Sequence, residues 1–124
     1  ASRDRCRRPR RPSVTADAVY SANTLHIMSW PEVEAFFSGV GQALAVGGVL
    51  VVYGPFRYAG NFTSESNAVF DRSLRERDPA SGIRDIEAVN RLAETQGLAF
   101  TADHAMPANN QLLVWVRRAP VSVD

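Results

Sequence analysis

An amide and an imidazole follow the end of a predicted buried strand near the start of the chain. Residues 16–21 form a run that is small or apolar at most positions, and the polar Asn23 and His26 come soon after it. Continuous apolar character, without alternation, is typical of a strand buried on both faces of a sheet. An imidazole can act as a general base and an amide can bond a ligand. These two side chains therefore mark a candidate site at the end of the strand.

A second predicted strand ends in a comparable segment. Residues 49–53 are apolar and mostly β-branched, and they are bounded by Gly48 and Gly54, which is the pattern of a core strand. Tyr53 and Phe56 lie at and just beyond its end. In open α/β sheets, ligands bind at the carboxyl ends of parallel strands. We therefore expect Tyr53 and Phe56 to lie near Asn23 and His26, where simple packing is the alternative role for the two aromatic residues.

A helix is predicted between these strands. Ser29 and Glu32 have the spacing of a capping box, and Pro31 falls in the first turn, where its missing N–H costs nothing. Apolar residues at helical spacing follow on one face, namely Val33, Phe36, Phe37, Val40 and Leu44. We expect the helix to end at Gly47-Gly48. Strand, helix and strand together predict a right-handed parallel βαβ unit.

The second half of the chain is predicted to contain two helices and two strands. The first helix spans about residues 65–77 and the second about residues 85–96, and the residues expected to face inward are Val69, Phe70, Leu74, Ile86, Val89, Leu92 and Ala93. Arg84 and Asp85 are expected to form a local ion pair that caps the second helix. Strands are predicted at residues 98–101 and 112–116. The connection between them is too short for a crossover helix, so we expect an antiparallel pair.

Two polar pairs in this half can be interpreted in two ways. Ser66 and Asn67 open a helix, where free N–H groups could bind a carboxylate or phosphate, but such residues more often only cap the helix. Asn109 and Asn110 lie on the turn between the last strands, where asparagine tolerates left-handed backbone. The predicted element order is β-α-β-α-α-β-β, an α/β fold whose sheet is mostly parallel with an antiparallel last strand.

Composition and charge limit the class of protein. The 124 residues are 45% hydrophobic, enough for one small domain with a core. No apolar run approaches the roughly 20 residues needed to span a membrane, and no secretory signal is visible, so we expect a cytoplasmic protein. Cys6 is the only cysteine and only two histidines occur, which argues against a disulfide or a metal site.

The basic residues are unevenly distributed. Residues 1–12 hold six arginines and one aspartate, whereas residues 13–124 carry a net charge of −4. We expect residues 1–12 to be a disordered tail, residues 13–118 the domain and residues 119–124 a second tail. The first tail could be a nucleic-acid-binding arm, but no aromatic residue interleaves its arginines, so nucleic acid is an unlikely partner. Because the chain contains no lysine, which indicates a gene rich in G and C, residues 1–12 could also come from out-of-frame translation.

Several separate motifs in order resemble one known family. They are SANTLHIMSW at residues 21–30, YGPF at 53–56, SNAVFD at 66–71, GIRDIEAV at 82–89, MPANN at 106–110 and LVWVRR at 113–118. Together they resemble the class I methyltransferase-like proteins catalogued as domain of unknown function 938, which are related to methyltransferase-like protein 26. The resemblance covers about residues 15–118. It implies the C-terminal half of a Rossmann-like, S-adenosylmethionine-dependent methyltransferase fold, with its fourth to seventh strands and the antiparallel last strand inserted beside the fifth.

The resemblance also implies roles for single residues. His26 would be the catalytic base, and Asn23 and Leu25 would contact the cofactor. The residues implied to line the substrate side are Tyr53, Phe56, Ser66, Asn67, Asn109 and Asn110. The acceptor would be a small molecule, because an acidic domain disfavours nucleic acid. The alternative for His26 is a structural imidazole that packs near Trp30.

The first three strands of the fold have no counterpart in this sequence. The Gly-rich loop and the acidic residue that hold the cofactor in such folds would come with those strands. We therefore expect the chain to be inactive alone, and S-adenosylmethionine to be bound only by the complete protein. The strand at residues 16–21 would keep an unpaired edge, which favours self-association or pairing with a partner chain. A non-catalytic module that pairs through this edge is the alternative function.

Overall fold

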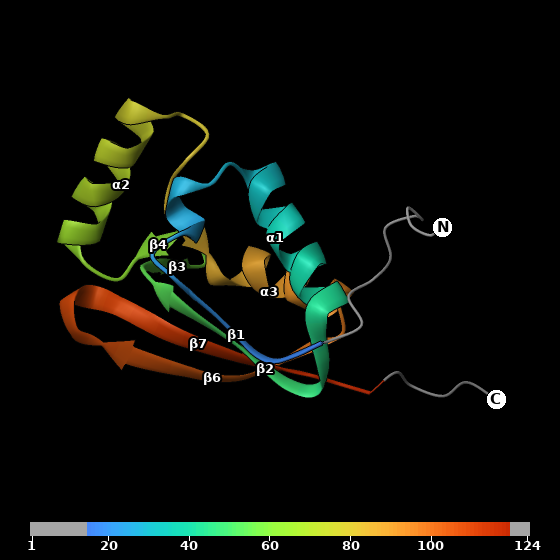
Figure 1. The fold of residues 1–124 in the computed structure, drawn as a ribbon. Helices are drawn as coiled ribbons and strands as arrows, with labels where there is room; N and C mark the ends of the chain where they lie inside the picture. The colour runs from blue at the N-terminus through green and yellow to red at the C-terminus, as the bar shows by residue number, and fades with distance from the viewer. Residues whose placement is uncertain (1–14, 120–124) are drawn as a thin grey trace, which may run out of the picture.

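A four-stranded sheet with strand order β1-β2-β7-β6 organises the fold (Figure 1). The structure is a computed structural model and describes residues 15–119. Strand β1 (Ala16–Ala22) is parallel to β2 (Leu44–Gly54), and β7 (Asn110–Arg117) runs antiparallel between β2 and β6 (Leu98–Met106). The predicted α/β class and the insertion of the antiparallel last strand beside its neighbour are confirmed. The tail predicted at residues 1–12, and all but the first residue of the one at 119–124, lie outside the described residues.

Helices connect these strands on one side of the sheet. Helices α1 (Trp30–Ala43), α2 (Glu65–Arg77) and α3 (Ile86–Thr95) all lie on the same side in Figure 1. Two short 3₁₀ turns, η1 (Leu25–Ile27) and η2 (Pro107–Asn109), follow β1 and precede β7. A second small sheet has the order β4-β3-β5 and consists of β3 (Phe56–Tyr58), β4 (Asn61–Phe62) and β5 (Arg84–Asp85). These strands were not predicted, because segments of two or three residues show no periodicity.

The core lies between the sheet and helices α1 and α3. Leu50 of β2 pairs with Trp115 of β7, and both side chains are 0% exposed. The Trp115 indole N–H donates to Asn90 Oδ1 of α3 at 2.9 Å, so its polar atom is satisfied inside the core. The other core residues include Val33, Phe37, Val40, Leu44, Val52, Val89, Ala93, Leu98 and Leu113. Each fully buried large side chain contributes about 1.5–3 kcal/mol.

The opposite face of the sheet is apolar and is covered by none of the described helices. Tyr20 of β1 pairs with Val51 of β2, which pairs with Val114 of β7, so the three side chains share that face. Tyr20 is 64% exposed, and the two valines are only partly buried. We call the face that carries these three residues the open face.

The first helix begins where predicted and ends earlier than predicted. The capping box is confirmed: Ser29 N donates to Glu32 Oε1 at 2.8 Å, and Glu32 N donates to Ser29 Oγ at 3.3 Å. The predicted stop at Gly47-Gly48 is wrong, because α1 ends at Ala43 and Leu44 begins β2. The pairing with β1 jumps from Leu44 to Val49, and Gly47 takes a left-handed φ of 83° in the irregular segment. The two glycines therefore allow an irregular start to a strand.

The predicted bounds of α2 are confirmed, whereas its predicted inward face is right for Leu74 and wrong for Val69 and Phe70. Leu74 is buried, whereas Val69 is 50% and Phe70 38% exposed. The buried positions of this helix also include the polar Asn67 and Asp71. The helix lies over loops that offer backbone groups to bond, so polar side chains occupy its inner side.

Two further expectations about the second half need correction. Strand β6 continues to Met106, beyond the predicted end at residue 101, because a bulge between Phe100 and Ala102 restores its pairing with β7. The predicted ion pair between Arg84 and Asp85 is also wrong. The Asp85 carboxylate accepts instead from Arg57 Nε at 2.8 Å and Nη2 at 3.0 Å, and it makes no capping hydrogen bond.

The one-sided core predicts unequal effects of two adjacent substitutions in β2. Leu50→Ala should lower the free energy of unfolding of the monomer by about 2–5 kcal/mol, because it leaves a cavity between sheet and helices. Val51→Ala, on the open face, should cost about 1 kcal/mol or less. Urea unfolding at low micromolar concentration measures both. Equal losses would mean that the open face is as well packed in solution as the core.

Candidate functional site

A pocket of about 530 Å³ lies at the carboxyl ends of β1 and β2. Its walls come from the segment after β1, the β2–β3 junction, the first turns of α2, and the η2 turn with the start of β7. The lining residues are Asn23, His26, Pro55, Ser66, Asn67, Phe70, Ala108 and Asn110. We call this the strand-end pocket. It has the size of an ordinary small-molecule site and the position that open α/β sheets give to their ligands.

His26 is the residue of the strand-end pocket that is best able to take part in a reaction. Its side chain is almost fully buried, and its ring meets Phe70 edge-on with 5.5 Å between ring centroids. Its carbonyl accepts from Gly82 N at 2.9 Å, which fixes the backbone of η1. Burial lowers the pKa of His26 below its usual 6.5. The imidazole is therefore neutral at pH 7 and able to accept a proton. The ring packs on Phe70, and the expected neighbour, Trp30, contacts Arg84 instead.

Asn23 links the ends of the two parallel strands. Its backbone N donates to Tyr53 O at 2.8 Å, one residue beyond the regular pairing of β1 with β2. Its φ of 56° is left-handed, a conformation that asparagine adopts more readily than most residues. The exposed amide side chain lines the pocket, and no hydrogen bond fixes it to another described residue. Its amide is therefore free to bond a ligand.

Asparagine side chains join α2 to the turn before β7. Asn67 is 6% exposed, and its Nδ2 donates to Thr63 Oγ1 and to Asn109 O, both at 3.1 Å. The Asn109 Nδ2 donates to Ser66 Oγ at 3.4 Å. Asn109 has the left-handed backbone predicted for the turn, with a φ of 61°. The cap of α2 is Ser64, whose Oγ accepts from Asn67 N at 3.1 Å, so neither Ser66 nor Asn67 caps the helix.

Not every residue of the expected site reaches the pocket wall. Leu25 and Phe56 are 3% and 2% exposed and belong to the core, so their side chains offer no surface to a ligand. Tyr53 does not line the pocket, but its hydroxyl accepts from Nδ2 of the lining residue Asn110 at 3.2 Å. Asn109 is exposed on the rim and acts through its bonds to α2.

Three wall residues were missed as site residues: Pro55, Phe70 and Ala108. For Phe70, helical spacing was the available signal. It lies four residues after Ser66 and three after Asn67, which places all three on one side of a helix. The apolar character of Phe70 suggested the core instead.

The strand-end pocket is lined by uncharged side chains. None of its lining residues is ionised at neutral pH, given the neutral His26. Among residues 15–119, no three His, Cys, Asp or Glu side chains lie close enough to hold a metal ion. Within the same range no helix has the length and apolar character needed to cross a membrane. The pocket's chemistry is thus hydrogen bonding, aromatic contact and one neutral base.

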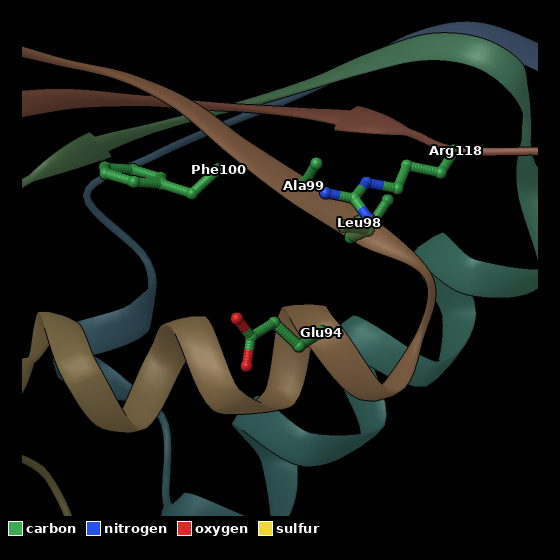
Figure 2. A pocket seen from close by; sticks show the side chains of 5 residues that line it. All are labelled: Glu94, Leu98, Ala99, Phe100 and Arg118. Carbon is green, nitrogen blue, oxygen red and sulfur yellow. The ribbon is translucent and has the colours of Figure 1, made fainter.

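A second pocket of about 430 Å³ lies at the other end of the sheet (Figure 2). In Figure 2, Glu94 of α3 points into the gap below β6, and Arg118 follows the end of β7 beside Leu98. The remaining lining residues are Ala99 and Phe100. It opens at the amino end of β6, away from the carboxyl ends of the parallel strands, where α/β sheets place their ligands. We therefore base the functional argument on the strand-end pocket.

Comparison with known proteins identifies both a family and a fold. The model of the family described as protein of unknown function DUF938 matches residues 3–117. The fold is similar to an O-methyltransferase family protein from Burkholderia thailandensis, with a TM-score of 0.73 and 17% identity over 86% of this chain and 32% of that one. It is also similar to an O-methyltransferase family 2 protein from Planctomyces limnophilus in complex with apigenin, with a TM-score of 0.75 and 16% identity over 83% and 31%.

Human N-acetylserotonin methyltransferase in complex with S-adenosylmethionine is a third similar structure, with a TM-score of 0.70 and 13% identity over 83% of this chain and 30% of that one. The chain therefore spans about a third of the length of the solved structures it matches. The methyltransferase-like fold is shown by these similarities, and it corresponds to only a part of each of these proteins.

The described residues alone do not fit S-adenosylmethionine. No carboxylate lines the strand-end pocket, so ribose hydroxyls find no acidic partner there. Within residues 15–119, no Gly-rich turn joins a strand to the start of a helix at this edge, where backbone N–H groups could hold the cofactor. The residues present form a wall suited to a neutral ligand.

The buried imidazole predicts a pH dependence of folding. Because the pKa of His26 is lowered in the folded state, the unfolded chain binds a proton there at a higher pH than the folded chain does. The free energy of unfolding should therefore fall as the pH decreases from about 7 through 6.5. His26→Gln should flatten this part of the profile, measured by urea unfolding at several pH values. His104→Gln, on an exposed part of β6, is the control that should keep the slope, and an unchanged slope in His26→Gln would contradict the assignment.

Proposed function

We propose, from the premise that the chain belongs to the DUF938 family and has a methyltransferase-like fold, that it forms the acceptor-binding part of an S-adenosylmethionine-dependent methyltransferase. The observation that carries the proposal is the neutral, buried imidazole of His26 in a charge-free pocket at the carboxyl ends of two parallel strands. A base is useful there because transfer to a hydroxyl requires removal of its proton.

The bound cofactor would supply the methyl group, and residues of this chain would act on the acceptor. His26 would accept the proton of the acceptor's hydroxyl. Its ring is held against Phe70, and the carbonyl of the same residue is fixed by Gly82 N, so the base has a defined position. Burial of the imidazole would keep it neutral before the reaction.

The pocket wall favours a small, uncharged, partly aromatic acceptor. Phe70 offers an aromatic surface, while Asn23, Ser66 and Asn110 offer hydrogen-bonding groups without charge. A charged acceptor would lose its hydration and gain no counter-ion. One structure of similar fold was solved with apigenin, which makes uncharged phenols a reasonable first class to test.

The cofactor side is proposed to come from the remainder of the complete protein. Asn23 and the backbone at Leu25 lie where β1 ends, so they are the residues of this chain proposed to meet the cofactor. The chain alone, as a fragment, is then expected to be inactive. The relation to methyltransferase-like protein 26 and the cytoplasmic location stay predictions from the sequence.

Methyl transfer by the complete protein tests the proposal. With radiolabelled S-adenosylmethionine and a panel of uncharged phenols that begins with apigenin, we expect transfer to a hydroxyl. His26→Gln should lower kcat by about 10²–10⁴-fold, because general base catalysis contributes that much. His104→Gln is the matched control and should keep kcat. Full activity in folded His26→Gln, or no transfer to any phenol by a protein that binds the cofactor, would refute the assignment.

A non-catalytic role through the sheet edge is the second candidate, favoured by one observation. Among residues 15–119, strand β1 pairs only with β2, so within that range its other edge carries unpaired backbone groups, and the adjoining open face is apolar. Such an edge can add a strand from another chain. The partner could be a second copy or another polypeptide.

Self-association tests this second candidate. The 124-residue chain should form dimers or larger species at tens of micromolar in analytical ultracentrifugation. Tyr20→Lys places a charge on the exposed face of β1 and should shift the distribution towards monomer. Ala105→Lys, on the exposed part of β6, adds the same charge elsewhere and should leave it unchanged. A monodisperse wild-type monomer that melts cooperatively would contradict this role.

A further inference from the structure

Three arginines from three elements surround a small pocket outside the strand-end pocket. Arg57 of β3, Arg75 of α2 and Arg84 of β5 line a cavity of about 280 Å³ together with Trp30, Ile83, Asp85 and Ala88. We call it the arginine pocket. The methyl-transfer proposal makes no use of it, and none of its lining residues is shared with the strand-end pocket.

Two of these arginines already have carboxylate partners. Arg57 forms a two-pronged salt bridge with Asp85, at 2.8 and 3.0 Å. Arg75 Nε donates to Asp71 Oδ2 at 2.9 Å, and the other oxygen of Asp71 accepts from Ile83 N at 2.8 Å. Both carboxylates therefore already accept hydrogen bonds from partners within the fold. The terminal nitrogens of Arg75 make no hydrogen bond to another described residue, and its side chain is 47% exposed.

Arg84 is the uncompensated charge of the group. No carboxylate of residues 15–119 forms a salt bridge with it. Its Nη2 donates to the carbonyls of Met28 and Ala80, its guanidinium lies 5.6 Å from the centre of the Trp30 ring, and its buried Nε has no acceptor. Burial, followed by the charges of Arg75 and Arg57, lowers the pKa of Arg84, although the charge of Asp71, which is hydrogen-bonded to Arg75, acts in the opposite direction. A partly buried cation with neutral partners and two cationic neighbours creates a positive potential.

We infer that the arginine pocket binds an oxyanion, a phosphate or carboxylate group, between Arg84 and Arg75. The excess of one positive charge favours a single anionic group, because Arg57 and Arg75 are balanced by Asp85 and Asp71. Guanidinium groups bind carboxylate and phosphate through paired N–H donors. A cavity of about 280 Å³ lies near the lower end of the range of small-molecule sites, so the ligand is a small anion or the anionic end of a larger molecule.

Trp30 makes the binding measurable in the intact chain. The chain has two tryptophans, Trp30 at this pocket and Trp115 in the core. We expect titration with inorganic phosphate, at constant ionic strength set with chloride, to shift the indole N–H signal of Trp30 saturably in ¹H–¹⁵N NMR spectra. The signal of Trp115 should stay in place. A parallel titration with acetate distinguishes the two chemistries: the anion with the lower Kd identifies the group that the pocket prefers.

Matched charge variants decide whether the arginines carry the binding. Arg75→Ala should raise the Kd about tenfold, because it removes charged hydrogen-bond donors. Arg118→Ala, which removes the same charge at the far end of the sheet, should leave the Kd unchanged. Arg75→Ala is preferred to Arg84→Ala, since Arg84 also holds two backbone carbonyls that the fold needs. The absence of a saturable shift with either anion, or equal Kd values for the two variants, would overturn the inference.

Discussion

The parallel pairing of β1 with β2 is the interaction on which the other features depend. It runs from Ala18–Val49 to Ala22–Tyr53 and is extended by the hydrogen bond from Asn23 N to Tyr53 O. Because the strands are parallel, both chain segments leave the sheet at the same edge. The imidazole that follows β1 therefore meets the backbone that follows β2: a Cβ on Gly54 would lie only 3.8 Å from His26 Nδ1. The strand-end pocket lies beside the chain segments that follow β1 and β2.

The rest of the molecule is built on one side of that pairing. Helices α1 and α3 bury the side of β2 and β7 that carries Leu50 and Trp115, while the side that carries Val51 and Val114 lacks a covering helix among residues 15–119. A sheet buried on one face gains roughly half of the apolar burial that a sheet covered on both faces would gain. The sequence of β2, apolar at every position from Val49 to Tyr53, nevertheless fits a strand that is covered twice. The apolar sequence of β2 is therefore matched by a covering layer on one face only among residues 15–119.

The sequence predicted the elements that have strong local signals and missed those that depend on tertiary contacts. The capping box at Ser29 and the antiparallel final pair follow from local rules and were predicted correctly. The early end of α1 was missed, because Leu44 satisfies the helical pattern as well as it satisfies its buried place in β2. The proximity of Asn23 and His26 to the end of β2 followed from strand order, whereas the place of Asn110 at the pocket followed from the family resemblance. The orientation of Phe70 did not, because it depends on which loops lie under α2.

The polar inner side of α2 sets this helix apart from α1 and α3. It is held by Asn67 on the carbonyl of Asn109, by Asp71 on Ile83 N and by Leu74, where the other two helices are held mainly by aliphatic and aromatic packing. Hydrogen bonds can exchange with water at low cost, whereas core packing cannot. The wall that carries Ser66 and Phe70 is therefore fixed to the rest of the fold mainly by hydrogen bonds of buried side chains. Asn67 thus both lines the pocket and holds α2 against the turn before β7, so the shape of the pocket depends on this one amide.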